Sequence, residues 1–388
     1  MVYTTIIYFT VFMISLIFCR IYEKKENNLD ENKKLILLVL TAVPLILLAT
    51  LRYNVGTDYF AYIKNAANIQ DLFSLKLIFV YYSKEPLYVI FTYLGMALFH
   101  SFVGAVYVYS LIFVFFIIEG IRYYKDKISM TLSLFIFCIG YYLIFFNATR
   151  QMIALAIVFF ASRYLVEKKL WKYIFWIIIA GLFHKTAYVM ILLYLLNFKL
   201  ESPKAIKIYY ILILISPLLM YPFMKLVLVL TNMFGIFTRL SKMNIVWNFR
   251  FLLYLIPEFI IIFTYRKQIL ELDKKNELFY RLVVLQFPAQ MMGVFVEYAD
   301  RLSIYFGVFE LVLMCLVLKA GDKTEENRLK LKNIKLDNFF SKIYLLYLKI
   351  VNSKKFKVGI IVCWNLAYFT VKYILLNSNG VYPYTSLF

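Results

Sequence analysis

The sequence predicts an all-α protein that crosses a membrane many times, and two observations carry this prediction. The chain of 388 residues is 63% hydrophobic and has a mean hydropathy of +0.76, whereas soluble domains are about 45–50% apolar. The apolar residues form runs of roughly 15–20, the length that crosses about 30 Å of hydrocarbon as a helix. Backbone groups in lipid must be satisfied within such a helix. We therefore expect one integral membrane domain over 1–388, a polytopic transmembrane helical bundle of about 12–14 spans.

The apolar runs define the candidate spans in chain order. They are 2–19, 35–51, 86–99, 102–119, 129–147, 150–166, 171–184, 186–197, 206–222, 249–265, 279–297, 301–319 and 358–376. The first run follows an uncharged N-terminus without a small-residue cleavage site, so we interpret it as a retained span. Polar residues interrupt segment 223–248, where we expect an extracytoplasmic or re-entrant segment.

The net charge of +21 is distributed as in a membrane protein and not as in a nucleic-acid-binding protein. Basic residues gather in short connections between apolar runs, which the positive-inside rule places in the cytoplasm. The densest basic stretch is the loop 320–357, in which 336–351 has the spacing of an amphipathic interfacial helix. These assignments place 52–85, the first extracytoplasmic connection with short helices, on the outer face. The corners 147–150 and 184–186 join it there.

One inconsistency concerns the number of crossings before the basic residues Arg122, Lys125 and Lys127. Counting 86–99 and 102–119 as two full crossings from an outside start would leave these residues outside. Either part of 60–99 is re-entrant or adds a short crossing, or the first hairpin is inverted. We favour the first alternative, because the connection 20–34 is more basic than 52–85.

Polar side chains gather at five predicted outer positions. They are Arg52, Tyr59 and Asp58 around Gly56, with Glu85 closing the same connection; Asn147, Arg150 and Gln151; His184 and Lys185; Glu297, Asp300 and Arg301; and the tail Tyr382-Pro383-Tyr384, with Arg239 and Arg250 flanking 223–248. Arginine at a helix start can grip a phosphate bidentately. Histidine can bind a phosphate or move a proton. Each residue also has a structural interpretation, since arginines at helix ends commonly reach lipid headgroups.

Other polar residues are interpreted as structural or stay open. Glu258 and Glu310 lie inside spans, where they are protonated, paired or lining a cavity. His100 lies at a short turn and is interpreted as structural. The four scattered cysteines predict neither disulfides nor a metal site. We therefore expect no cofactor and a metal-independent activity.

The ordered motifs resemble the EpsG family of bacterial exopolysaccharide-synthesis membrane proteins, which are functionally akin to Wzy-type polysaccharide polymerases. The matching residues are Arg52-Tyr53-x-x-Gly56-Thr57-Asp58-Tyr59-x-x-Tyr62, Glu85-Pro86-Leu87-Tyr88, Asn147-x-x-Arg150-Gln151-x-x-Ala154 and Phe183-His184-Lys185-Thr186-Ala187. The resemblance covers roughly 50–190. A weaker similarity links the first outer connection to membrane glycosyltransferases of the GT-C type, in which a loop carboxylate serves as the base.

The resemblance implies a glycosyltransferase that uses polyprenyl-diphosphate-linked glycans as donor and acceptor at the outer face of a bacterial plasma (inner) membrane. We assign Asp58 as base, Glu85 and His184 as supporting catalytic residues, and the basic and polar residues of the outer positions as the substrate or diphosphate site. The binding set is Arg52, Tyr59, Arg150, Gln151, Lys185, Arg239, Arg250 and Arg301. Membrane lipid, and a chain-length regulator and a flippase of the same pathway, are the expected partners, with no nucleic acid.

Two alternatives stay open. A transporter or flippase of lipid-linked oligosaccharide would show internal repeats and a charged central cavity, and no repeat is apparent in the sequence. A membrane-bound O-acyltransferase of glycans would need a deeply placed catalytic histidine, whereas His184 lies at a corner. The sequence leaves open whether the product is capsule, O-antigen or exopolysaccharide.

Overall fold

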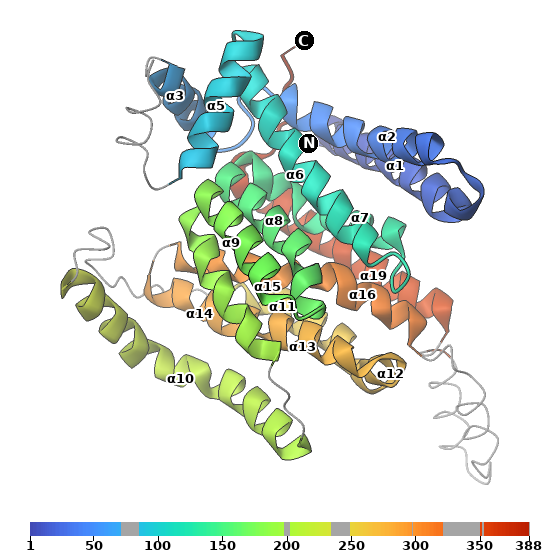
Figure 1. The fold of residues 1–388 in the computed structure, drawn as a ribbon, viewed down its shortest axis with the longest axis vertical. Coiled ribbons are helices and arrows are strands. Elements are labelled where there is room, and N and C mark those ends of the chain that lie inside the picture. The colour runs from blue at the N-terminus through green and yellow to red at the C-terminus, as the bar shows by residue number, and fades with distance from the viewer. Residues whose placement is uncertain are drawn as a thin grey trace.

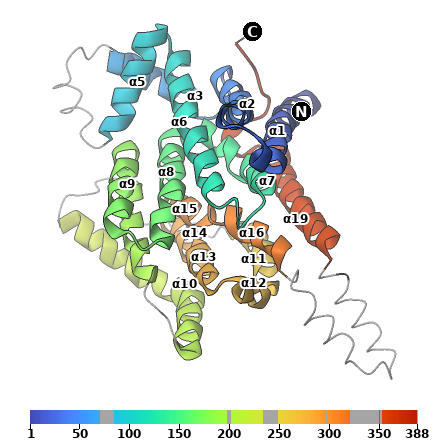
Figure 2. The same cartoon turned by 45° about the vertical axis from the view of Figure 1, so that its right-hand side comes forward.

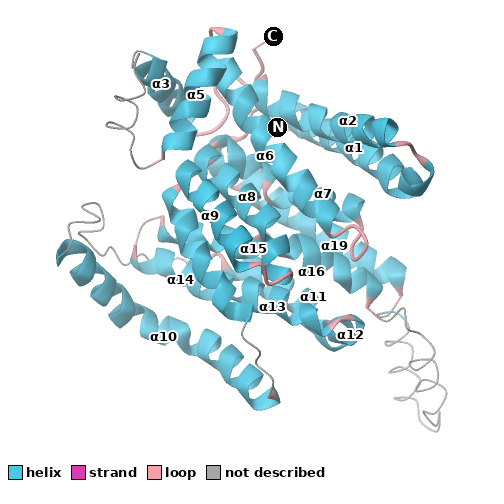
Figure 3. Cartoon of the chain, viewed as in Figure 1, coloured by secondary structure: helices cyan, strands magenta, loops and turns pink. Residues whose placement is uncertain are grey.

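The structure, a computed structural model, describes residues 1–70, 85–197, 202–233, 249–296, 298–320, 350 and 353–387. Within these ranges the chain forms helices and connections, and the only extended pairing is a single bridge between Arg52 and Ser386 (Figure 3). The prediction of an all-α bundle is confirmed.

The N-terminal half of the bundle is a series of antiparallel helices (Figure 1). Its elements are α1 (Val2–Lys25), η1 (Glu26–Asn28), α2 (Glu31–Thr50), α3 (Tyr59–Gln70), α5 (Pro86–Phe99), α6 (Phe102–Tyr123), α7 (Met130–Gly140), η2 (Tyr142–Phe146), α8 (Thr149–Val166), α9 (Leu170–Phe183) and η3 (Lys185–Asn197). Side-chain caps start several helices, as Asp30 shows by accepting a hydrogen bond from the Lys33 amide at 2.8 Å at the head of α2.

The C-terminal half is more broken. Its elements are α10 (Pro203–Met233), α11 (Leu252–Thr264), α12 (Arg266–Leu272), η5 (Lys274–Asn276), α13 (Glu277–Val284), α14 (Gln286–Phe295), η6 (Ala299–Leu302), α15 (Ser303–Gly307), α16 (Glu310–Lys319), α19 (Lys354–Phe369), the π-helix η7 (Thr370–Leu375) and η8 (Ser378–Gly380). Helix α10 continues to Met233, so the first part of segment 223–248 extends this helix.

The bundle has two chemically different ends. At the basic end, Lys125 pairs with Glu26, Lys127 pairs with Asp273 at 2.8 Å, and the Lys319 ammonium donates to the Asp126 carbonyl at 2.8 Å. At the other end, which we call the motif end, the four sequence motifs and the C-terminal tail meet. Basic connections therefore collect on one side of the bundle and the motifs on the other, as the positive-inside rule predicts.

Helix α5 bears on the number of crossings, because it does not run the length of the bundle as the interpretation of 86–99 as a full span requires. Helix α5 begins at the motif end and turns back at His100 into α6, which alone continues to the basic end at Lys125 (Figures 1 and 2). The hairpin is tight because Gly95 and Gly104 face each other, and a Cβ on either would lie within 2.7 Å of neighbouring backbone or Phe99. Helix α5 therefore packs as a hairpin against the first half of α6 at the motif end and does not reach the basic end.

Several crossings use segments that are short or not α-helical. Within the described ranges, eight helical stretches, some of them made of consecutive short elements, are long and apolar enough to span a membrane, fewer than the predicted spans. The remaining apolar segments form shorter helices of 10–17 residues. The 13-residue 3₁₀ helix η3 runs from His184 at the motif end towards the basic end, where the Asn197 amide donates to the Leu165 carbonyl at 2.9 Å. A 3₁₀ helix rises about 2.0 Å per residue against 1.5 Å for an α-helix, so a short segment covers more depth.

Helix α8 is the centre of the bundle, and α10 is its edge. In the most apolar 18-residue stretch of α8, 78% of the residues are buried, and in that of α10 the share is 6%. Figure 1 shows α10 lying apart from the other helices. Ala154 and Ala156 on α8 are fully buried, because small side chains let neighbouring helices approach closely. Arg239, Glu297, residues 71–84 and most of the loop 320–357, with its expected amphipathic helix at 336–351, lie outside the described residues.

The two-ended arrangement predicts the labelling of single cysteines from either side of the membrane. In a background in which Cys363, the exposed native cysteine among the described residues, is replaced by serine, Tyr53→Cys should react with an impermeant maleimide in intact cells. Lys127→Cys should react only after permeabilisation, because Lys127 lies with Asp273 at the basic end, which the positive-inside rule places in the cytoplasm. Labelling of both residues from the same side would contradict the arrangement of α5 and α6.

Candidate functional site

Three motifs meet at the carboxylate of Glu85, the residue that caps the start of α5. One carboxylate oxygen forms an ion pair with Arg150, at the head of α8. The other lies 2.7 Å from Nδ1 of His184, which ends α9, and 3.4 Å from the Lys185 amide. The Glu85 side chain is 10% exposed and that of Arg150 40%, so the pair has one buried and one open partner. We call these residues the Glu85 cluster.

The electrostatics of the cluster keep Glu85 ionised. Burial by itself would raise the pKa of Glu85, but the hydrogen bond with His184 and the positive charge of Arg150 outweigh it. The pKa of Glu85 is therefore lowered below its usual value. An ionised Glu85 fixes the Arg150 side chain while leaving part of the guanidinium facing solvent.

The Asp58 loop reaches the cluster through Asn147. The Asp58 amide donates to the side-chain oxygen of Asn147 at 3.3 Å, and the Tyr62 hydroxyl donates to the Asn147 carbonyl at 2.7 Å. Asn147 lies three residues before Arg150, so one short connection holds both the predicted base and the predicted phosphate ligand. The Asp58 carboxylate itself is partly exposed and pairs with no other side chain among the described residues.

Gly56 makes this approach possible. Its φ is +101°, and a Cβ would lie 2.7 Å from Oδ1 of Asn147 and 2.8 Å from the Phe146 carbonyl oxygen. Only glycine adopts this backbone at low cost and leaves that space empty. The close approach of the Asp58 loop to Asn147 thus has a steric explanation.

The C-terminal tail clamps the same loop. The amides of Gly56 and Thr57 donate to the carbonyls of Gly380 and Asn379 at 2.9 and 3.2 Å. The side-chain amide of Asn147 also donates to the Asn379 carbonyl, at 2.8 Å. Further along, the Tyr53 amide donates to the Thr385 carbonyl at 2.8 Å. The loop, the start of α8 and the tail therefore form one hydrogen-bonded unit.

Arg52 and Tyr59, both predicted substrate ligands, are instead buried inside this unit. Arg52 is 2% exposed and Tyr59 3%. The Arg52 guanidinium lies 4.5 Å from the ring centre of Phe146, and burial lowers the pKa of Arg52 to about 10, which leaves it charged at neutral pH. Neither side chain is therefore open to the surface. They anchor the loop that carries Asp58.

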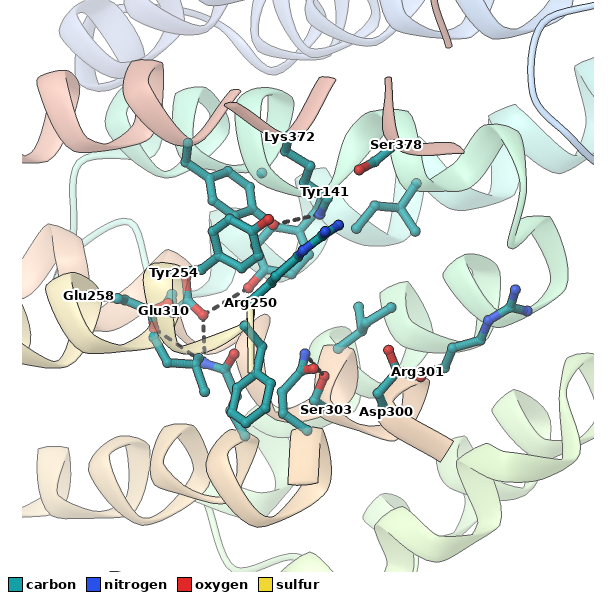
Figure 4. Close-up of a pocket in the computed structure, with 18 of the residues that line it drawn as sticks. Tyr141, Arg250, Tyr254, Glu258, Asp300, Arg301, Ser303, Glu310, Lys372 and Ser378 are labelled. Carbon is teal, nitrogen blue, oxygen red and sulfur yellow. Dashed lines mark hydrogen bonds between the residues drawn. The ribbon is translucent and has the colours of Figure 1, made fainter. Parts of the chain in front are cut away.

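A cavity of about 740 Å³ opens beside the motif end. Asn147, Asn379 and Arg301 line it near the motif end, and Arg250 reaches over it from the start of α11 (Figure 4). The Gln151 side chain is buried and donates to the Arg301 carbonyl at 2.7 Å, which ties α8 to η6. Of the predicted binding set, Arg250 and Arg301 therefore line the cavity, and Gln151 positions one of them.

The floor of the cavity holds polar residues that the sequence analysis left without a role. Glu258 and Glu310 both line it, so the open interpretation that they face a cavity is confirmed. Lys372, on the π-helix η7, lies opposite them (Figure 4). Its position in an apolar segment was the available signal, since charge inside a span is costly. Among the described residues no three His, Cys, Asp or Glu side chains are grouped as metal ligands would be; metal independence stays a prediction.

Comparison with known proteins gives one family. The sequence model of the EpsG family matches residues 35–336. No curated protein and no solved structure matches the chain. The matched range contains the Glu85 cluster, Asp58 and Asn147, whereas α19 and the tail lie beyond it.

The steric constraint at Gly56 predicts the effect of adding one methyl group. Gly56→Ala should lower the free energy of unfolding by about 1–3 kcal/mol, because φ is positive and the Cβ meets two oxygens. Gly359→Ala is the control, since a Cβ there meets nothing within 4 Å. Unfolding in detergent would measure both, and equal midpoints for the two variants would contradict the proposed contact.

The lowered pKa of Glu85 predicts a pH-dependent contribution to stability. Glu85→Gln should cost about 1–2 kcal/mol at neutral pH, an estimate reduced for the exposure of Arg150. Because the folded-state pKa lies below that of the unfolded chain, the difference from wild type should hold above about pH 5. It should shrink as pH falls through the folded-state pKa. A difference that persists unchanged at pH 3 would show that Glu85 contributes through packing and not through charge.

Proposed function

The chain belongs to the EpsG family, and from this membership and the grouping of its motifs we propose that it is a polysaccharide polymerase. It would join polyprenyl-diphosphate-linked oligosaccharide repeat units on the outer face of a plasma membrane. The observation that carries the proposal is the convergence on Asn147 and Glu85, which brings a partly exposed carboxylate, Asp58, and a partly exposed guanidinium, Arg150, to the same end of the bundle.

The proposed reaction needs two groups of opposite charge. The acceptor sugar hydroxyl attacks the anomeric carbon of the donor, and its proton passes to a base. The bond between that carbon and the diphosphate oxygen breaks, and the electron pair stays on the diphosphate, which cations stabilise. A carboxylate alone or an arginine alone would support only half of this chemistry.

We assign these roles to residues with suitable exposure. Asp58 is the base, since its carboxylate has no charged partner among the described residues. Arg150 holds the diphosphate through the exposed part of its guanidinium, while Glu85 and His184 fix its orientation. Arg250 and Arg301 extend the positive surface along the cavity rim. The buried Arg52 positions the loop.

A lipid-linked oligosaccharide flippase is the second candidate, and the cavity favours it. A charged cavity that reaches into the bundle is a property that transporters also have. An O-acyltransferase is less well supported, because His184 is bound to Glu85 at a corner of the motif end. Purified protein with a lipid-linked repeat unit would separate the first two, since a polymerase gives a ladder of products and a flippase gives lipid movement across liposomes without a ladder.

The assignment of the base predicts the behaviour of Asp58→Asn. Polymer formation should fall by a factor of about 10²–10⁴, the usual contribution of a general base, while the amount of folded protein stays at the wild-type level. Asp126→Asn makes the same chemical change at an exposed position of the basic end and should leave polymer unchanged. Wild-type polymer yield from Asp58→Asn in the purified system would remove Asp58 from the role of base.

A further inference from the structure

The floor of the cavity is a buried polar cluster built from four helical segments. The Gln286 side chain donates to Glu310 at 2.6 Å and to Glu258 at 3.2 Å, and the Tyr141 hydroxyl donates to Glu310 at 3.1 Å. Gln286 and the two glutamates are 6–8% exposed. Burying this much polarity in a membrane protein is costly and is found where it serves a cavity or a ligand.

The cluster brings two acids and one base to the same cavity. The carboxyls of Glu258 and Glu310 lie close together, since both accept hydrogen bonds from the side-chain amide of Gln286. Lys372 lines the same cavity, and its ammonium donates to the Tyr368 hydroxyl at 2.5 Å. Lys372 lies in the π-helical turn η7, an irregularity frequent at functional sites. The floor is therefore rich in hydrogen-bond donors and acceptors.

Aromatic side chains complete the lining above this floor. Tyr254, Trp364 and Tyr368 all line the cavity, and the rings of Tyr254 and Tyr368 meet edge to face with centroids 5.2 Å apart. Glu258 follows Arg250 by about two helical turns, so the floor lies about 12 Å below the rim. Aromatic rings beside convergent polar groups are characteristic of a small-molecule site of this volume.

The lining selects among possible occupants. A polyprenyl chain would bury the carboxyl pair and Lys372 against hydrocarbon, which is unfavourable for polar groups. A diphosphate would be repelled by the carboxyls, although the rim arginines Arg250 and Arg301 suit it. A neutral sugar both donates and accepts hydrogen bonds, and its ring faces can pack on aromatic side chains.

We propose that the floor of the cavity, formed by Glu258, Gln286, Glu310 and Lys372, is a saccharide subsite together with Trp364 and Tyr368 above it. It takes a neutral sugar of the lipid-linked glycan while the rim arginines hold its diphosphate. This inference rests on the proposed function for the identity of the lipid-linked glycan. Sugar recognition would thus be spread over α11, α14, α16 and α19, away from the Asp58 loop.

The test compares the binding of two lipids that differ only in their sugar. Purified full-length protein is mixed with polyprenyl diphosphate and with lipid-linked oligosaccharide extracted from polymer-producing cells, and native mass spectrometry gives the ratio of the two complexes. The variants are Glu310→Gln, which keeps the shape of the side chain, and Trp364→Leu, at a half-buried position that folding should tolerate. Ile260→Ala, at an exposed position of α11, is the control.

The wild type and Ile260→Ala should prefer the sugar-bearing lipid. Glu310→Gln should reduce that preference about tenfold, the usual effect of losing a buried hydrogen bond to a charged group, with unchanged binding of polyprenyl diphosphate. Trp364→Leu should reduce it in the same direction. An unchanged preference in both variants, an equal loss for both lipids, or no preference in the wild type would overturn the subsite.

The polymer ladder assay separates this inference from the proposed function. A wild-type ladder together with no sugar-dependent change in binding would leave the polymerase standing and remove the subsite. Sugar-dependent binding that the variants lose, without any ladder from the wild type, would support the subsite and remove the polymerase.

Discussion

The motif end depends on the hydrogen bonds that Asn147 makes. Its side-chain oxygen accepts from the Asp58 amide, and its side-chain nitrogen donates to the Asn379 carbonyl. The backbone carbonyl of the same residue accepts from the Tyr62 hydroxyl. An amide can do this because it offers a donor and an acceptor on one rigid group. Gly56 leaves the space that the amide occupies. Three distant parts of the chain are therefore held in register by one side chain.

Much of the fold could be predicted from the sequence, because lipid imposes strong rules. Run length and basic loops were enough to predict an all-α bundle with the motifs at one end and the basic connections at the other. The number of crossings around 86–99 was left open because α5 is as apolar as a span, and hydropathy does not show whether a helix turns back. The paired glycines of the α5–α6 hairpin were the local signal.

The residues of the site could be predicted from the sequence, but their contacts with one another could not. Asp58, Glu85, Arg150 and His184 were singled out, yet the sequence carried no information that Glu85 binds both Arg150 and His184. Arg52 was expected to face substrate, and instead it lies under the tail against Phe146. Gln286 donates to both Glu258 and Glu310 and so joins three helices, and spacing along one helix does not reveal a partner on another.

The clamp by the tail has a consequence for how the protein is made. Tyr53 and Thr385, which meet at the motif end, are 332 residues apart in the chain. A loop that leaves the ribosome early must wait, through the insertion of every later helix, for the residues that fix it. Closing so long a loop costs conformational entropy and is delayed until α19 has entered the bilayer. The Asp58 loop is therefore synthesised early, directly after α2, and is among the last parts to be ordered. A chain halted before α19 would carry the Asp58, Arg150 and His184 motifs without the tail that holds the Asp58 loop.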